Sequence, residues 1–448
     1  MSIEALRVAI SSGTIDTVLL ALTDMQGRLQ GKRLHAPFFL DEVLTHGSEA
    51  CNYLLAVDVE MNTVGGYAIS GWERGYGDFA MIPDVSTLRR LPWQPGTALV
   101  LADLAWLDGT PVAESPRQIL RRQLDLLEQE HGLIAYVGTE LEFVAHKESY
   151  EDAMRLGYRQ LTPVNGYNVD YSVLGTARVE PLLRRIRLEM AGAGLSPESA
   201  KGECNLGQHE IAFRYDRALT TADHHTVYKN GAKEIAAQEG CSITFMAKPN
   251  AREGNSCHVH FSLRTRRGEP VMSAPGGALS QLGERVLAGM LAATRDLSVL
   301  LAPNINSYKR FQAGSFAPTA LRWGRDNRTC ALRLVGRGPS LRVEHRVPGA
   351  DVNPYLVIAA LVAAARHGLS AGLDLEDEFP GNAYADATAP RVPGTLREAL
   401  GAWRDSALAR EAFGEQVVAH YARAAEVEIE AYDSAVTDWE LRRGYERL

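Results

Sequence analysis

Four segments with the alternating pattern of β-strands carry charged side chains on one face, and this pattern limits the possible folds more than any other feature. In residues 137–146 (VGTELEFVAH), Glu140 and Glu142 are two residues apart, so both project from the same face of the predicted strand. Two like charges side by side repel, and such a pair is tolerated chiefly when a cation or strong donors lie between them. A solvated strand face explains this segment equally well, so the choice between a solvated face and a cation site depends on the other segments.

The three other segments repeat the arrangement. A lone strand histidine is more often structural, but two at period-two spacing after a Gly/Asn loop favour a functional pair. Arginines on both sides of a glutamate suit an anion beside a metal ion. The residues are Glu203 and Glu210 in residues 201–215, His258 and His260 in residues 253–263, and Arg342, Glu344 and Arg346 in residues 340–356.

The side chains in these segments indicate the class of cation. Carboxylates with one or two imidazoles favour hard octahedral Mg²⁺ or Mn²⁺ over zinc. Cys204 and Cys257 lie beside candidate ligands, but the five cysteines are scattered without a CxxC pair, so we interpret them as small buried side chains in a reducing compartment.

A second cluster is basic. Arg310, Arg328 and Arg333, with Arg342 and Arg346, place five positive charges within about forty residues, a pattern typical of a clamp for a transferring phosphoryl group. The chain has no GxxxxGK[ST] loop and no kinase-type glycine-rich loop. Metals, arginines and pocket shape would therefore have to hold ATP.

The chain divides into two predicted domains, residues 1–108 and 109–448. Strand signals at Thr17–Thr23, before Leu34 and at residues 98–104 predict a small α+β domain. A helix capped by Ser115 and starting at Pro116 opens the larger region. Residues 65–78, rich in glycine, are predicted to form a loop.

Composition excludes several classes of partner. With 46% apolar and 23% charged residues the chain is typical of a globular protein, and a net charge of −8 without a basic block argues against nucleic acid and an anionic membrane surface. The longest apolar run, residues 355–365, is about half of the ~20 residues that a membrane span needs, so we expect a buried helix. The N-terminus has no signal or transit pattern, which predicts a cytoplasmic protein.

Taken in order, these motifs resemble those of the glutamine synthetase family over nearly the whole chain: TDMQGRLQGKR, ExE, E…GQHE, HxH, NSYKR, DNRT, RxExR and NPYL. The resemblance implies an α+β fold with a small N-terminal β-grasp-like domain and a large catalytic domain, in which helices flank a curved antiparallel sheet. It also implies a homododecamer of two stacked hexameric rings, in which the N-terminal domain of a neighbour completes each active site. The terminal residues 439–448 are predicted to form a helix that contacts other subunits.

The resemblance assigns roles to most of these residues. It implies an ATP-dependent ligase that uses two to three Mg²⁺ or Mn²⁺ ions and forms γ-glutamyl phosphate before a nitrogen nucleophile displaces phosphate. One metal site would comprise Glu142, Glu203 and Glu210, and the other Glu140, His258 and Glu344. Glutamate would be bound by Gly254, Arg310 and Arg346, and ATP by His260, Ser262, Arg333 and Arg342, while Arg328, with Arg310 and Arg346, forms the catalytic set.

Two positions depart from the family pattern. Where true glutamine synthetases have a glutamate that takes a proton from ammonium, this chain has Phe316, and an asparagine before the glutamate-binding glycine is replaced by Glu253. Loss of the carboxylate removes a charge and a base, while a phenyl ring offers an apolar wall or a cation–π face. We therefore predict a γ-glutamyl-amine ligase whose amine specificity depends on Phe316, Glu253 and Asp58.

Alternatives remain at this point. Phe316 could merely pack the loop while an acid in residues 58–60 of a neighbour captures ammonium, as in a true glutamine synthetase. A catalytically inactive binding protein is a further alternative, opposed by the intact ligand set. The organic amine is ethanolamine or a polyamine, with a short amine favoured because Phe316 narrows the space. The surroundings of Tyr384 do not match the tyrosine that some members adenylylate, so we predict no such modification.

Overall fold

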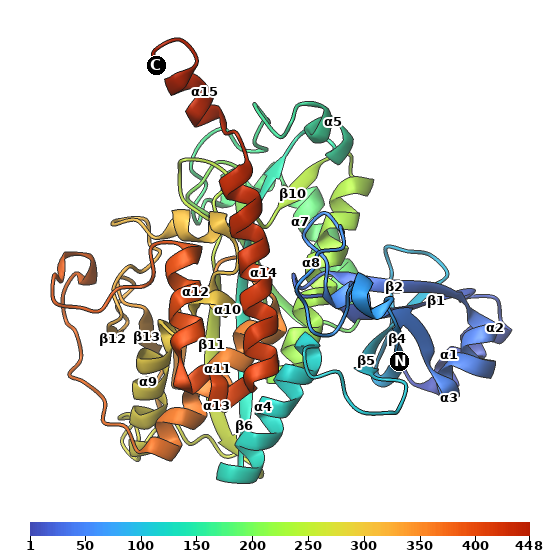
Figure 1. The fold of residues 1–448 in the computed structure, drawn as a ribbon, viewed down its shortest axis with the longest axis horizontal. Coiled ribbons are helices and arrows are strands. Elements are labelled where there is room, and N and C mark those ends of the chain that lie inside the picture. The colour runs from blue at the N-terminus through green and yellow to red at the C-terminus, as the bar shows by residue number, and fades with distance from the viewer.

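A computed structural model describes residues 1–448 and contains two β-sheets, each with its own helices (Figure 1). The first sheet has the strand order β2-β1-β5-β4-β3, in which β1 pairs antiparallel with β2 and parallel with β5. Its strands are β1 (Thr17–Thr23), β2 (Leu29–His35), β3 (Ser48–Cys51), β4 (Asp78–Arg90) and β5 (Thr97–Ala105). Helix α1 (Ile3–Ser11) and the short α2 (Ala36–Phe38) and α3 (Leu44–His46) accompany them.

This first sheet has a core of its own. Nineteen buried residues, all within residues 6–112, form a cluster separate from the 84-residue main core, which also includes Ala21 of β1 and Leu99 and Leu101 of β5. Strands β1 and β5 are near-continuous apolar runs, which explains why both of their faces are buried, and the sequence predicted both strands. It did not identify β3 or the long β4, whose pattern of buried residues is irregular.

The second sheet carries the charged strands. Its order is β12-β13-β14-β11-β6-β8-β7, with β9 and β10 also paired to β6, and all its pairs are antiparallel except β12 with β13. The strands are β6 (Leu133–His146), β7 (Pro197–Gly202), β8 (Gln208–Phe213), β9 (Asp216–Arg217), β10 (Ser242–Thr244), β11 (Cys257–Thr265), β12 (Trp323–Arg325), β13 (Leu332–Val335) and β14 (Arg342–His345). The predicted α+β class, with helices flanking the sheet, is confirmed.

Helices cover the second sheet (Figure 1). Helix α4 begins at Pro116 after Ser115 as predicted, and α11 and α9 pack against each other through close backbone contacts at Gly289 and Gly368. The helices are α4 (Pro116–His131), α5 (Tyr150–Arg155), α6 (Val173–Ala177), α7 (Glu180–Gly192), α8 (Ala218–Gln238), α9 (Gln281–Thr294), α10 (Ser298–Leu301), α11 (Pro354–Ala371), α12 (Leu396–Asp405), α13 (Ala407–Phe413), α14 (Glu415–Ser434) and α15 (Asp438–Gly444).

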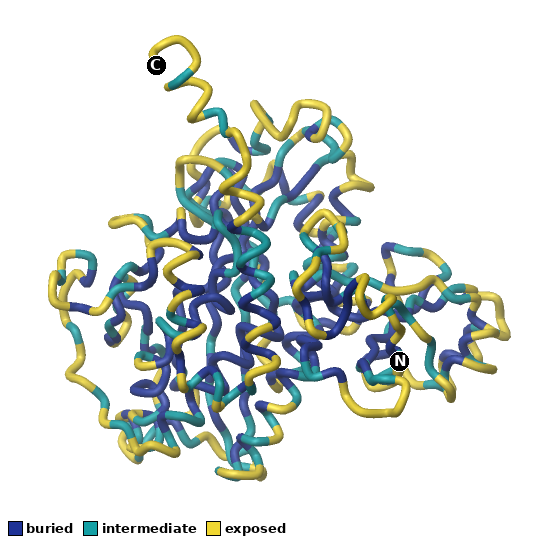
Figure 2. Tube along the Cα trace, in the orientation of Figure 1, coloured by how far each residue is buried: buried dark blue, intermediate teal, exposed yellow.

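Two helices have unusual surroundings. Helix α11 is long and apolar enough to cross a membrane by length and composition alone, but 72% of it is buried inside the protein, where it forms part of the main core. Helix α15 instead projects from the body with mostly exposed residues (Figure 2). Its capping box, in which the Thr437 and Glu440 side chains and backbone amides bond reciprocally, stabilises its first turn.

Candidate active site

Strands β14, β11, β6 and β8 are consecutive neighbours in the second sheet, so their polar faces form one surface. Register aligns the pairs directly: His258 lies opposite Glu140, His260 opposite Glu344, and Glu142 opposite Glu210. Opposite residues on antiparallel strands share a face, with Cβ atoms about 5 Å apart. The four strand patterns in the sequence therefore converge in space.

Glu142, Glu203 and Glu210 form the first acidic cluster, with carboxylate oxygens within 4.8 Å of one another. Oε2 of Glu142 accepts hydrogen bonds from the Ser256 amide at 2.7 Å and from Nε2 of Gln208 at 3.0 Å. Burial raises the pKa of Glu142 well above its usual value, and the other two carboxylates raise it further. The pKa of Glu210 rises to about 8 through burial and neighbouring acids.

These perturbed carboxyl groups test whether a cation fits the cluster. Three carboxylates held this close repel one another in a partly dry site, and a divalent cation among them would remove both the repulsion and the cost of burial. Their all-oxygen donor set is the one that Mg²⁺ and Mn²⁺ prefer. The residues present therefore fit a hard divalent ion.

The second cluster combines acids with imidazoles. Ligand atoms of Glu140, His260 and Glu344 lie within 4.8 Å of one another, and Nδ1 of His258 is 3.3 Å from Glu140 Oε2 and 3.5 Å from Glu344 Oε1. Nε of Arg342 donates to Nδ1 of His260 at 3.1 Å, so the ring proton sits on Nε2 and is donated to Glu140 at 2.8 Å. Burial opposes ionisation of Glu140, but its hydrogen bonds with both histidines outweigh it and lower the pKa.

His258 was the one imidazole expected at this second metal site, and the structure brings His260 to the same carboxylates. His258 is buried, its Nε2 has no hydrogen-bond partner, and burial lowers its pKa, which favours the neutral ring, the form that can donate a lone pair. The register explains both positions, because the two histidines lie on consecutive same-face positions of β11.

Glu344 joins the acidic clusters to the arginines. Its Oε2 accepts from Nη1 of Arg333 at 2.8 Å, and its Oε1 contacts Nη1 of Arg346. Burial disfavours the charged carboxylate, but neighbouring His258 and Arg346 outweigh burial and lower the pKa of Glu344 to about 2. Strand β14 ends at His345, so Arg346 lies just beyond the strand rather than within it as expected.

Arg310 is buried beneath the cleft. It donates from Nη1 to the Val347 carbonyl at 2.9 Å and from Nη2 to Ser256 Oγ at 3.0 Å. Gly254 packs directly on it, because a Cβ at this position would lie 2.6 Å from Arg310 Cγ and 2.5 Å from the Ala247 carbonyl. Only glycine therefore fits beside this arginine.

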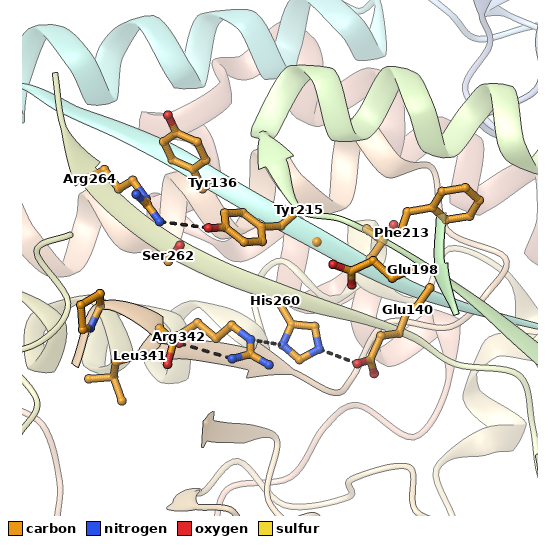
Figure 3. A pocket seen from close by; sticks show the side chains of 15 residues that line it. Tyr136, Glu140, Glu198, Phe213, Tyr215, His260, Ser262, Arg264, Leu341 and Arg342 are labelled. Atoms are coloured by element: carbon orange, nitrogen blue, oxygen red, sulfur yellow. Dashed lines mark hydrogen bonds and ion pairs between the residues drawn. The ribbon is translucent and has the colours of Figure 1, made fainter. Parts of the chain in front are cut away.

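Two cavities meet at Glu140. The first, of about 490 Å³, is lined by the predicted nucleotide-binding residues His260, Ser262 and Arg342 (Figure 3). The second, of about 460 Å³, is lined by the first acidic cluster, Gly254, His258, Phe316, Arg328 and Arg346, and also by Arg333. Arg333 is thus separated from the other three nucleotide candidates and lies on the side of the second cavity.

The first cavity contains residues that the sequence analysis did not select. The Arg264 guanidinium lies 5.0 Å from the Tyr136 ring centroid and donates from Nη2 to the Tyr215 hydroxyl at 3.1 Å (Figure 3). Tyr136 and Arg264 continue the same period-two pattern as Glu140 and His260 along their strands. Extending that pattern by two further same-face steps, which is four residues, along each strand would have found both.

The three residues expected to set amine specificity lie in different places. Phe316 and Glu253 line the second cavity. Phe316 has a left-handed backbone (φ +61°), its side chain is 57% exposed, and its carbonyl accepts from Nη2 of Arg346 at 3.3 Å. Asp58 lines another cavity and accepts backbone hydrogen bonds from Glu60 and Asn62. Asp58 is not among the residues that line the second cavity of its own chain.

Comparisons with known proteins agree with this geometry. The family described as "Glutamine synthetase, catalytic domain" matches residues 113–444. The chain is 65% identical to gamma-glutamylethanolamide synthetase GlnA4 of Streptomyces coelicolor, over 100% of this chain and 96% of that protein. It is 41% identical to a glutamate–isopropylamine ligase of a Pseudomonas species, over 98% and 96% of the two chains. A solved structure titled as a GmaS/ADP complex superimposes with a TM-score of 0.86 at 26% identity, over 98% and 99% of the chains.

Proposed function

We propose that this chain, which belongs to the glutamine synthetase family, uses ATP to join the γ-carboxylate of glutamate to a small organic primary amine. The observation that carries the proposal is Phe316, an exposed aromatic ring at the cleft position where ammonium-using members have an acid. The names of both relatives, one specifying an ethanolamide product and the other isopropylamine as the amine joined to glutamate, support an organic amine over ammonium.

Two cavities that share a carboxylate suit a two-substrate reaction. ATP binds in the first cavity, with His260, Ser262 and Arg342 beside its phosphates. Tyr136 and Arg264 lie against its adenine ring or its ribose. Glutamate binds in the second cavity, where Arg346 and the Gly254 loop position its carboxylates, and Arg310, buried behind Gly254, supports that loop. The γ-phosphate and the γ-carboxylate then meet near Glu140.

The acidic clusters hold the divalent ions. We assign one Mg²⁺ or Mn²⁺ to Glu142, Glu203 and Glu210, and a second to Glu140, His258 and Glu344, with His260 close enough to contribute. When bound, these ions neutralise phosphate charge and polarise phosphoryl and carboxylate oxygens.

The reaction has two displacement steps. A γ-carboxylate oxygen of glutamate attacks the γ-phosphorus of ATP, the bond to the β-phosphate oxygen breaks, and ADP leaves. The neutral amine nitrogen then attacks the acyl carbon of γ-glutamyl phosphate, the C–O bond breaks, and the departing phosphate takes up the proton that the nitrogen loses. Arg328 and Arg333 face this region and stabilise the oxygens on which charge develops, while Arg346 holds the glutamate in place.

Among amines, we propose a short one of the ethanolamine type. Phe316 presents its ring to the cleft and Glu253 adds an acid beside it, which together suit a small chain with one reacting nitrogen. The 65% identity to a gamma-glutamylethanolamide synthetase supports this choice.

We also propose that residues 1–108 act as a separate domain and that the cytoplasmic enzyme assembles as a dodecamer. Asp58 lies away from the cleft of its own chain, which supports a role for it at a neighbouring active site.

Phosphate release tests the function. The assay contains glutamate, ATP and Mg²⁺ with ethanolamine, propylamine, 1,4-diaminobutane or ammonium as the nitrogen donor. We expect turnover with ethanolamine to exceed turnover with ammonium at least about tenfold in kcat/KM. Equal or better turnover with ammonium would identify a true glutamine synthetase instead.

A further inference from the structure

A lysine lies in the wall of the second cavity, on the side where Asp170 and Glu203 are its neighbours. Lys201, at the end of β7, contacts the Glu203 carboxylate, and its Nζ is 3.8 Å from Asp170 Oδ1 and 4.6 Å from the centre of the Tyr171 ring. These residues all line the same cavity as Phe316. Lys201 belongs to none of the sets of metal, ATP or glutamate ligands assigned above.

Two aromatic residues on this cavity share an uncommon backbone. Tyr171 and Phe316 both adopt left-handed conformations, with φ of +52° and +61°, although neither is glycine. Their side chains are 72% and 57% exposed, so no apolar burial compensates the strain. Exposed rings held at a strain cost on the border of a reaction cleft are suited to bind the carbon chain of a ligand.

The acids around Lys201 would, by themselves, attract a dication. Asp170, Glu203 and Glu253 all line the cleft, and a diamine carries a second ammonium that would pair with them. Lys201 already supplies an ammonium at this place, neutralises part of that charge, and repels another cation. Its contacts with Asp170 and Tyr171 do not depend on Glu203, so it stays in the wall when Glu203 binds a divalent ion.

We propose that Lys201 determines amine specificity: its ammonium excludes amines with a second positive charge and donates a hydrogen bond to a neutral oxygen at the far end of a short amino alcohol. This inference rests on the proposed function and narrows its substrate class. A buried or half-buried site that is built to bond a hydroxyl discriminates more strongly than an apolar wall does, because the unmatched polar group is left without a partner.

The test compares amines within each variant. kcat/KM is measured for ethanolamine, propylamine and 1,4-diaminobutane at saturating ATP, glutamate and Mg²⁺, for the natural protein, Lys201→Met and Lys201→Arg. We expect Lys201→Met to shift the ratio of diaminobutane to ethanolamine at least about tenfold towards the diamine, mainly through the KM for the amine. Lys201→Arg keeps the charge and is expected to retain the natural preference.

The ratio of kcat/KM for two amines within one variant is insensitive to changes in metal binding, because a change in Mg²⁺ affinity through Glu203 alters turnover with every amine by the same factor. A thermal-shift titration with Mg²⁺ alone supplies a readout that does not depend on turnover, and we expect both variants to keep an Mg²⁺-dependent shift. If Lys201→Met is inactive, Lys201→Gln decides: it keeps a polar side chain and removes the charge, so the relative kcat/KM for diaminobutane should rise about threefold or more.

An unchanged ratio in Lys201→Met or in Lys201→Gln, or a natural enzyme that prefers the diamine, would overturn the role of Lys201. These results differ from failure of the proposed function itself, in which the natural enzyme turns over with ammonium and with none of the organic amines.

Discussion

Replacing Phe316 by glutamate should convert an organic-amine enzyme towards ammonium. The side chain is 57% exposed on the cleft, and its backbone contact, the Phe316 carbonyl with Arg346, does not depend on the side chain. Neither residue is glycine, so the left-handed backbone is equally strained in both, and we expect the free energy of unfolding to change by less than about 0.5 kcal/mol. Any change in activity then reflects chemistry in the cleft.

The size of the effect follows from the exposure of this position. A carboxylate about 4 Å from an ammonium ion gains roughly 4 kcal/mol at an effective dielectric constant near 20. Because the position is more than half exposed, water screens this interaction, and we expect about 0.5 to 1 kcal/mol to remain. That corresponds to a gain of roughly 2- to 5-fold in kcat/KM for ammonium. Loss of the ring removes about 0.5 to 2 kcal/mol from organic-amine binding, a loss of roughly 2- to 30-fold.

The assay is phosphate release with ammonium and with ethanolamine as separate donors, on the natural protein, Phe316→Glu and Phe316→Leu. The leucine variant is the matched control, since it removes the aromatic face without adding an acid. We expect it to weaken ethanolamine use without improving ammonium use. If Phe316→Glu leaves both amines unchanged while its unfolding midpoint is also unchanged, the specificity does not lie at this position and the reasoning is refuted.

Three further predictions concern the cluster and the glycine loop. Glu142→Ala should abolish turnover and weaken the Mg²⁺-dependent thermal shift, because it removes an acid from the first cluster, and an active variant would contradict the assignment. Gly254→Ala places a methyl group 2.6 Å from Arg310 Cγ, so the KM for glutamate should rise about tenfold or more, whereas the control Gly401→Ala, with open space around it, should be neutral. Burial and nearby acids raise the pKa of Glu210 from 4.5 to about 8, so its protonation stabilises the folded, metal-free protein below about pH 4.5 and that stability is lost as pH rises to about 8. The unfolding midpoint in EDTA should therefore fall from pH 6 to pH 8 and recover with Mg²⁺, and a flat profile in EDTA would count against the cluster.

Much of the site could be predicted because side chains along a β-strand alternate between its two faces, so that every second residue shares a face. Glu140 with Glu142, and His258 with His260, share a face simply through two-residue spacing, whatever the rest of the fold does. The same spacing extends to Tyr136 and Arg264, which were missed because the pattern was followed only through residues with obvious ligand chemistry.

Other features depended on contacts between distant segments. Lys201 is an ordinary lysine in the sequence, and its importance arises only because Asp170 and Tyr171, from another loop, approach its ammonium. Likewise Asp58 and Arg333 carry suitable charges, but which cavity each one lines depends on how loops and strands pack.

The sequence by itself determined the fold class and the polar strand faces, because side-chain alternation is a local property of the backbone. Only the tertiary structure decided which acids and histidines lie together, because strand register places His258 opposite Glu140 and His260 opposite Glu344. A shift of one residue in either pairing would turn one partner to the other side of the sheet and separate the charges. Register is the sum of many hydrogen bonds and core contacts across distant segments, so no single motif reveals it.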